Sequence, residues 1–264
     1  MLGLLVLAAL AIYLVPIGMF LAERHHPHGV AGASHDVALD LKITVADFAK
    51  GVVTFHAVPS GGALMKPNGR LGSEVTLETD PGQGPISHTF RPDIPLTPWV
   101  FTVTPDEGDI LDYPLDAYRL ELEFGAHSGD RPIAVKSVLE DVPHGLKARL
   151  TETPAGNGQT GLDVAVARTA TMIFVALLST VSLVLVAAAA CTVAWQVAYR
   201  GRKIEFSMMV WVAALLFVIP TVRNALPGSP PVGALIDFLI FFWLQIAVVI
   251  AMSSLVWTWI RRGA

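Results

Sequence analysis

Four long apolar stretches and one polar middle region divide the chain. The apolar stretches cover residues 2–22, 169–199, 207–222 and 232–260. A helix needs about 20 apolar residues to cross the hydrocarbon core of a bilayer, so these lengths suit membrane-spanning helices. The third stretch is short, and we expect Pro220 to stop or kink its helix near the end. The pattern therefore predicts a bundle of four transmembrane helices.

The polar middle region, from residue 34 to residue 167, alternates hydrophobic and polar residues with a period of two. In DVALDLKITV the alternation places Val37, Leu39, Leu41, Ile43 and Val45 on one face, as in a half-buried strand. Similar runs are VVTFHAV, SEVTLET, WVFTVT, AYRLELEF, IAVKSVLE, LKARLTE and LDVAVA, and Gly- and Pro-rich segments separate them. About eight or nine short strands predict an antiparallel β-sandwich.

Basic residues at the ends of two apolar stretches predict the topology. They are Arg200, Arg202 and Lys203 after the second stretch, and Arg261 and Arg262 after the fourth. Short loops rich in Lys and Arg stay in the cytoplasm, so both termini are predicted to be cytoplasmic. Residues 25–167 are then extracytoplasmic, and the protein is a multi-pass protein of a bacterial inner (plasma) membrane.

A cleavable signal peptide is the alternative interpretation of the first apolar stretch. It lacks a basic beginning and has no small-x-small cleavage site before Glu23, so an uncleaved anchor is favoured. The expected fold class is an α+β membrane protein with three parts. Residues 1–24 form the anchor, residues 34–167 the β-sandwich, and residues 168–264 three further transmembrane helices. The last predicted strand runs into the second helix through Arg168 without a linker.

Composition excludes several classes of function. Hydrophobic residues make up 53% of the chain and charged residues only 15%, which is too apolar for an ordinary soluble domain. The net charge is −4 with no basic block, so nucleic acid is not an expected partner. The one cysteine, Cys191, excludes a disulfide within the chain. No nucleophile elbow, zinc-protease, Walker or dinucleotide motif occurs, and we expect no enzyme activity and no cofactor.

Two clusters are candidates for a metal site. ERHHPHG is a His-rich tract that could bind zinc or copper, and TPDEGDILDYPLD gathers carboxylates that could hold calcium. The alternative interpretations are a polar collar at the membrane or a pH-sensitive contact for the His-rich tract, and ordinary turn chemistry for the carboxylates. The candidate ligands are His25, His26 and His28 in the first cluster and Asp106, Asp109 and Asp112 in the second.

The segment TVRNALPGSPPVGALIDF places two opposite charges at the predicted outer ends of the third and fourth helices. An unpaired charge near lipid is costly, so we expect Arg223 to pair with Asp237. The prolines between them are expected to stiffen the loop. The alternative is a docking surface for a partner, contacted by Arg223 and Asn224. The structural or docking candidates are Arg223, Asn224, Pro227, Pro230, Pro231 and Asp237.

Three blocks carry a resemblance: DYPLDAY, RTATMIFVALL and LLFVIPTVRNALPGSPPVGALIDFLIFFW. Together they resemble an uncharacterised family of four-helix membrane proteins, with a domain of unknown function, from high-GC Gram-positive bacteria. The resemblance implies a membrane location and this architecture, without a reaction. Leu115 stands where the family usually has Phe in a YPFD-like corner, and we expect it to keep an apolar plug there.

The expected function is that of a non-catalytic accessory or assembly subunit of a cell-envelope membrane complex, such as a lipid-transport machine. The expected partners are other integral membrane subunits, including a lipid transporter, and membrane lipid. A homo-oligomeric channel or sensor whose sandwich reads a ligand is one alternative. An envelope enzyme or lipid-binding protein with an unrecognised site is the other.

Overall fold

The computed structural model describes residues 14–15, 17–19, 21–22, 37–81, 84–154 and 159–263. Their contacts form two compact units. The sheet unit runs through Asp109 and resumes from Asp116 to Thr169, and the helical unit contains Ile110–Leu115 and the chain from Ala170 onward. The placement of 110–115 in the helical unit was not expected. Most of the first predicted transmembrane helix, residues 2–22, lies outside the described residues.

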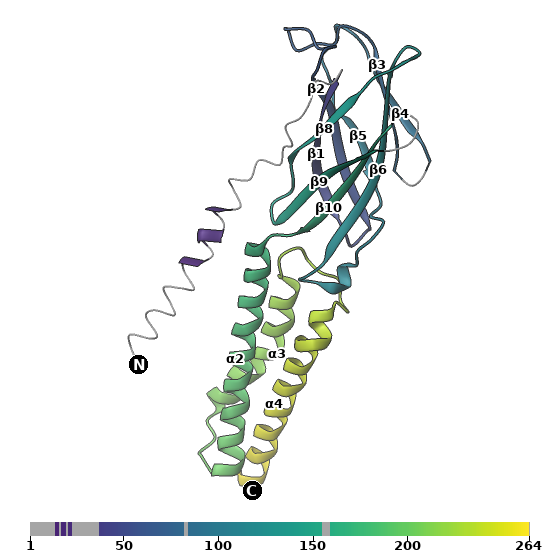
Figure 1. Ribbon diagram of the computed structural model, residues 1–264. Helices are drawn as coiled ribbons and strands as arrows, with labels where there is room; N and C mark the ends of the chain where they lie inside the picture. The colour runs from purple at the N-terminus through teal and green to yellow at the C-terminus, as the bar shows by residue number, and fades with distance from the viewer. Residues whose placement is uncertain are drawn as a thin grey trace. The chain divides into compact units, whose positions relative to one another are not determined.

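The strands of the sheet unit form two sheets (Figure 1). The strands are β1 (Val37–Asp47), β2 (Val52–Gly61), β3 (Val75–Asp80), β4 (Ile86–Phe90), β5 (Trp99–Val103), β6 (Ala117–Ser128), β7 (Arg131–Pro132), β8 (Val135–Asp141), β9 (Leu146–Pro154) and β10 (Thr160–Arg168). The four-stranded sheet has the order β5-β2-β1-β8. The six-stranded sheet has the order β4-β3-β6-β10-β9, with β7 paired to β6.

The core of the sheet unit follows from the alternation in the sequence. Along β6 every second residue from Tyr118 to Ala126 is buried, and Leu120 is completely so. Side chains of the two sheets contact each other, since Phe101 of β5 meets Phe124 of β6 edge-on with ring centroids 6.0 Å apart. Burying these alternating faces removes apolar surface from water, which stabilises the fold by about 25 cal/mol for each Å² buried.

The structure corrects three details of the strand prediction. The pairing of β1 with β8 is parallel, whereas all strands were expected to be antiparallel. Val45 was expected on the buried face, but it is 52% exposed. The register between β1 and β2 shifts between Ile43 and Val45, and such a bulge turns the following side chain outward. The pattern also missed β4, whose sequence ISHTF does not alternate clearly.

Three helices of the helical unit are long and apolar enough to cross a membrane. They are α2 (Ala170–Arg200), α3 (Phe206–Asn224) and the continuous pair η3 (Asp237–Phe241), a π-helical turn, and α4 (Phe242–Gly263). A short 3-10 helix, η1 (Ile110–Asp112), belongs to the same unit.

Helices α2 and α4 pack against each other, and most of the residues that α2 buries are small (the helices are labelled in Figure 1). The buried positions of α2 alternate in steps of four and three, as in coiled-coil packing. They are Ala176, Thr180, Leu183, Ala187, Ala190, Ala194 and Val197. Ala187 and Ala190 lie in the core, and small side chains of this kind allow close packing of membrane helices. Cys191 Sγ lies 3.8 Å from Ala247 O of α4.

Of the two outcomes expected for Pro220, a stop or a kink, the stop does not occur, since α3 continues to Asn224. Proline has no backbone N–H, so the Leu216 carbonyl four residues earlier loses its helical donor. Gln245 of α4 replaces it, because its Nε2 donates to Leu216 O at 3.3 Å. Neighbouring helices commonly satisfy backbone groups freed by proline in this way.

Replacing this donor tests the arrangement. We expect Gln245→Leu to lower the free energy of unfolding of the helical unit by about 1 kcal/mol. In a Pro220→Ala background the restored N–H satisfies Leu216, so the same change should cost clearly less. Thermal unfolding is followed by the reaction of the single cysteine, Cys191, with a thiol-reactive fluorogenic dye. Equal costs in the two backgrounds would contradict the assignment.

Gln196 of α2 provides the matched control. It is also half-buried in an apolar helix, and no hydrogen bond of its side chain is recorded among the described residues. Gln196→Leu is therefore expected to leave the unfolding midpoint within the error of the wild-type value, in both backgrounds.

Candidate functional site

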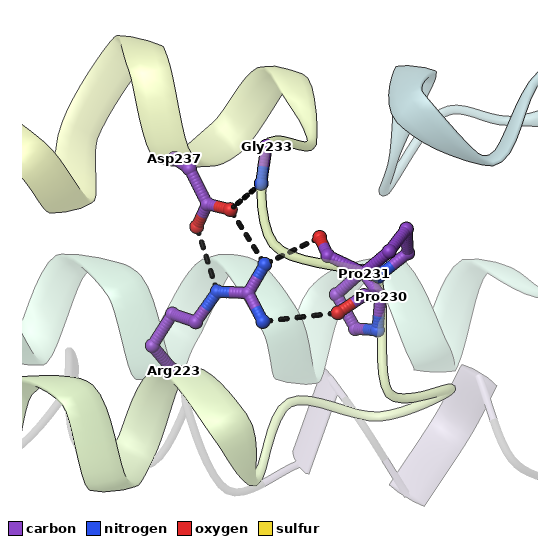
Figure 2. A network of polar contacts seen from close by, with 5 residues as sticks. All are labelled: Arg223, Pro230, Pro231, Gly233 and Asp237. Carbon is purple, nitrogen blue, oxygen red and sulfur yellow. Dashed lines mark hydrogen bonds and ion pairs between the residues drawn. The ribbon is translucent and has the colours of Figure 1, made fainter. Parts of the chain in front are cut away.

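The predicted ion pair joins the end of α3 to the start of η3 (Figure 2). Arg223 lies in the last turn of α3, and Asp237 is the first residue of η3. Arg223 donates from Nε to Asp237 Oδ1 at 2.7 Å and from Nη2 to Asp237 Oδ2 at 2.5 Å. Each charge also suits its helix end, because the helix dipole favours a cation at the C-terminus and an anion at the N-terminus.

The rest of the network fixes the connecting loop (Figure 2). Arg223 Nη1 donates to Pro230 O at 2.9 Å, and Nη2 donates to Pro231 O at 2.6 Å. Gly233 N donates to Asp237 Oδ2 at 2.8 Å. Arg223 is 8% exposed and Asp237 only 1%. With four hydrogen bonds from one guanidinium, the two charges are satisfied inside the protein, and they hold the loop in one conformation.

The structure brings together only part of the predicted set. Arg223, Pro230, Pro231 and Asp237 form the network, together with Gly233, which the sequence did not single out. Asn224 is exposed and Pro227 half-buried, and neither takes part in the recorded contacts of this network. The conformation of the loop also requires Gly228 and Gly233 at φ of +79° and +97°, which glycine adopts without strain.

Apolar side chains lie exposed beside this network. Val232 is 77% exposed and Leu235 is 45% exposed, and both belong to the connection that Arg223 holds. On η3 itself Phe238 and Leu239 are 59% and 63% exposed. Exposed apolar residues of this kind are typical of surfaces that contact another protein or membrane lipid.

A second buried ion pair lies in the sheet unit, and sequence reasoning missed it. Arg168 Nε, at the end of β10, donates to Asp116 Oδ1 at 2.5 Å, and Tyr118 Oη donates to Asp116 Oδ2 at 2.8 Å. The side chains of Arg168 and Asp116 are 3% and 0% exposed. Burial, followed by the bond to Asp116, raises the pKa of Tyr118, so its hydroxyl keeps its proton and continues to donate. The ring of Tyr118 stacks on Phe48.

One signal in the sequence could have indicated this pair. Asp116 belongs to DYPLDAY and Arg168 begins RTATMIFVALL, two of the three blocks that carry the family resemblance. Their separation of 52 residues gives no local pattern that would join them.

The apolar plug of the DYPLDAY corner is Tyr113. Leu115, expected to fill this role, is 71% exposed, whereas Tyr113 is completely buried in the apolar core of the helical unit. The same core contains Leu226 and Ile236 from the two sides of the Pro-rich loop. The bulk needed at this corner therefore comes from the aromatic ring two residues earlier.

The candidate metal ligands do not form a site in the described part of the chain. There, no group of three or more His, Cys, Asp or Glu residues is gathered around a position for a metal ion. Asp106 Oδ2 instead accepts a hydrogen bond from Glu121 N at 2.7 Å. Asp109 belongs to the sheet unit and Asp112 to the helical unit. His25, His26 and His28 lie outside the described residues, so that prediction stays open.

Comparison with known families agrees with the division into two units. Residues 168–262 match a family model described as a domain of unknown function, DUF8686. A second model matches residues 27–167, so the two matches meet between Ala167 and Arg168. No curated protein matches the chain. The second match covers more than half of the sequence, and the chain therefore belongs to the family described as a domain of unknown function, DUF4436.

Proposed function

We propose that the protein is a non-catalytic accessory or assembly subunit of a cell-envelope membrane complex, docked to another integral membrane subunit. Its two sheets form an extracytoplasmic β-sandwich, and its three apolar helices, with the first apolar stretch as a fourth, cross a bacterial plasma membrane. The basic ends of α2 and α4 support cytoplasmic termini. A complex that moves envelope lipids is the first one to test.

One observation carries this proposal: the loop between α3 and η3 is rigid, and its charges are already satisfied. Arg223 donates four hydrogen bonds inside the protein, so its guanidinium is not free to bind a substrate. The same loop presents Val232 and Leu235 to the outside. A preorganised loop with exposed apolar groups loses little conformational entropy on docking, which favours binding to another protein.

Recovery of the partner tests the proposal. The full chain is purified in mild detergent at native expression, and co-purifying proteins are quantified by mass spectrometry. We expect one membrane protein at a stoichiometric level. The double change Val232→Ala and Leu235→Ala should lower its recovery at least roughly tenfold, because each truncation removes about 1 kcal/mol of apolar contact.

The matched control truncates the same residue types at exposed positions of α2. Val181 is 53% exposed and Leu185 is 65% exposed, and neither belongs to the loop. Val181→Ala with Leu185→Ala should leave recovery unchanged. Recovery of a self-complex alone that conducts ions in liposomes would overturn the proposal and favour a homo-oligomeric channel. A monomer that carries bound lipid and no protein would favour a lipid-binding protein.

A further inference from the structure

Five cations gather at one end of the helical unit, although they come from two distant segments. Arg262, in the last turn of α4, donates from Nη1 to Arg202 O at 3.1 Å and from Nη2 to Ala198 O at 3.4 Å. These contacts bring the end of α4 to the connection that follows α2. The cluster, here called the basic end, consists of Arg200, Arg202, Lys203, Arg261 and Arg262.

The charges of the basic end have no carboxylate partner among the residues that the structure describes. All five side chains belong to exposed residues. Glu205 is the one acidic residue in the connection between α2 and α3. Its Oε2 accepts a hydrogen bond from Ser207 Oγ at 3.4 Å. The basic end therefore keeps a local excess of positive charge that the protein does not neutralise.

Aromatic rings place two of these cations at the boundary of the apolar helices. Arg200 lies over the Trp195 ring at 4.9 Å from its centroid, and Arg261 lies over Trp257 at 4.6 Å. Both indoles are about half exposed. Tryptophan is enriched where the hydrocarbon of a bilayer meets its head groups, so guanidinium groups on these rings are held at head-group depth.

We propose that the basic end is a binding site for the phosphate head groups of anionic phospholipids. The inference rests on the membrane-spanning part of the proposed function. The ligand is a lipid phosphate, because the cations adjoin the ends of apolar helices and two of them are fixed on interfacial indoles. Basic residues clustered next to a transmembrane helix attract anionic lipid in this way.

Lipid titration of the purified full chain tests the site. The protein, in a zwitterionic detergent, is titrated with dioleoylphosphatidylglycerol or dioleoylphosphatidylcholine, and retained lipid is counted by native mass spectrometry. We expect the anionic lipid to be retained preferentially. Arg202→Gln with Lys203→Gln should weaken its binding roughly 25-fold, about fivefold for each cation removed. These changes spare the Arg202 carbonyl that Arg262 binds.

Two exposed cations of the sheet unit supply the matched control. Lys147→Gln with Arg149→Gln removes the same charge from β9 and should leave the lipid affinity unchanged. Equal retention of both lipids, or an equal loss in the two double variants, would overturn the proposal. Competition by inorganic phosphate at the lipid's own concentration would also overturn it, since the site would then bind a free anion.

Failure of this inference is distinguishable from failure of the proposed function. Extraction of cell membranes at alkaline pH tests whether the chain is integral, and partner recovery tests docking. Neither measurement depends on the cations of the basic end. A membrane-integral protein that recovers its partner but shows no lipid preference would refute the lipid site alone.

Discussion

Arg168→Ala is expected to lower the free energy of unfolding of the sheet unit by about 3 to 5 kcal/mol. The change leaves the Asp116 carboxylate, whose side chain is 0% exposed, without its cation. The hydrogen bond from Tyr118 remains, but one neutral donor does not offset a buried charge. Chemical unfolding of the purified full chain, followed by the strand signal in circular dichroism, measures the effect.

An exposed pair of the same chemistry serves as the control. Arg119 on β6 donates to Asp163 on β10 from Nε at 3.0 Å and from Nη2 at 2.5 Å, but the side chains are 48% and 22% exposed. Arg119→Ala should leave the free energy of unfolding close to the wild-type value, because water solvates the remaining carboxylate. Similar losses in the two variants would mean that burial does not decide the contribution of Arg168.

The double variant Arg168→Met with Asp116→Leu separates the cost of an orphaned charge from the value of the pair. Both charges are removed together, so we expect a smaller loss than for Arg168→Ala alone. A loss equal to the sum of the two single changes would instead show that Arg168 and Asp116 contribute independently, with no coupling between their charges.

Strands with a strong alternation could be predicted from the sequence, because each of their buried positions carries an apolar residue. Leu39 and Leu41 are completely buried, as the alternation in β1 indicates. The error at Val45 arises from the bulge. The bulge depends on how β2 pairs with β1, and the alternation of hydrophobic and polar residues in β1 does not reveal it. The edge strand β4 was missed for a related reason, since only its last residue, Phe90, is buried.

The two buried ion pairs show the same limit of prediction from the sequence. The partners Arg223 and Asp237 are 14 residues apart and lie on opposite sides of one loop, so predicted topology alone brings them together. Arg168 and Asp116 are 52 residues apart. Arg168 ends β10 and Asp116 directly precedes β6, and the register of these two strands comes only from the structure. Likewise, Tyr113 rather than Leu115 is buried, because the direction of a side chain in a tight corner depends on the backbone there.

Arg223→Ala and Asp237→Ala are each expected to destabilise the helical unit by about 3 to 5 kcal/mol. Either change leaves one charge that the protein buries, since Arg223 is 8% exposed and Asp237 is 1% exposed. The loop also loses the bonds that Arg223 donates to Pro230 O and Pro231 O. Cys191 of α2, which contacts α4, reports the unfolding of this unit through its reaction with a thiol-specific dye.

The double variant decides between the structural and the docking interpretations of this pair. If the pair is structural, Arg223→Ala with Asp237→Ala is no less stable than the worse single variant, because no unpaired charge remains. Asn224→Ala, an exposed neighbour at the end of α3, should stay within about 0.5 kcal/mol of the wild type. Single variants that remain stable but no longer recover the partner would instead make Arg223 and Asp237 direct contact residues. Loss of stability and partner together, with recovery restored in the double variant, would mean that the pair acts by holding Val232 and Leu235 in place.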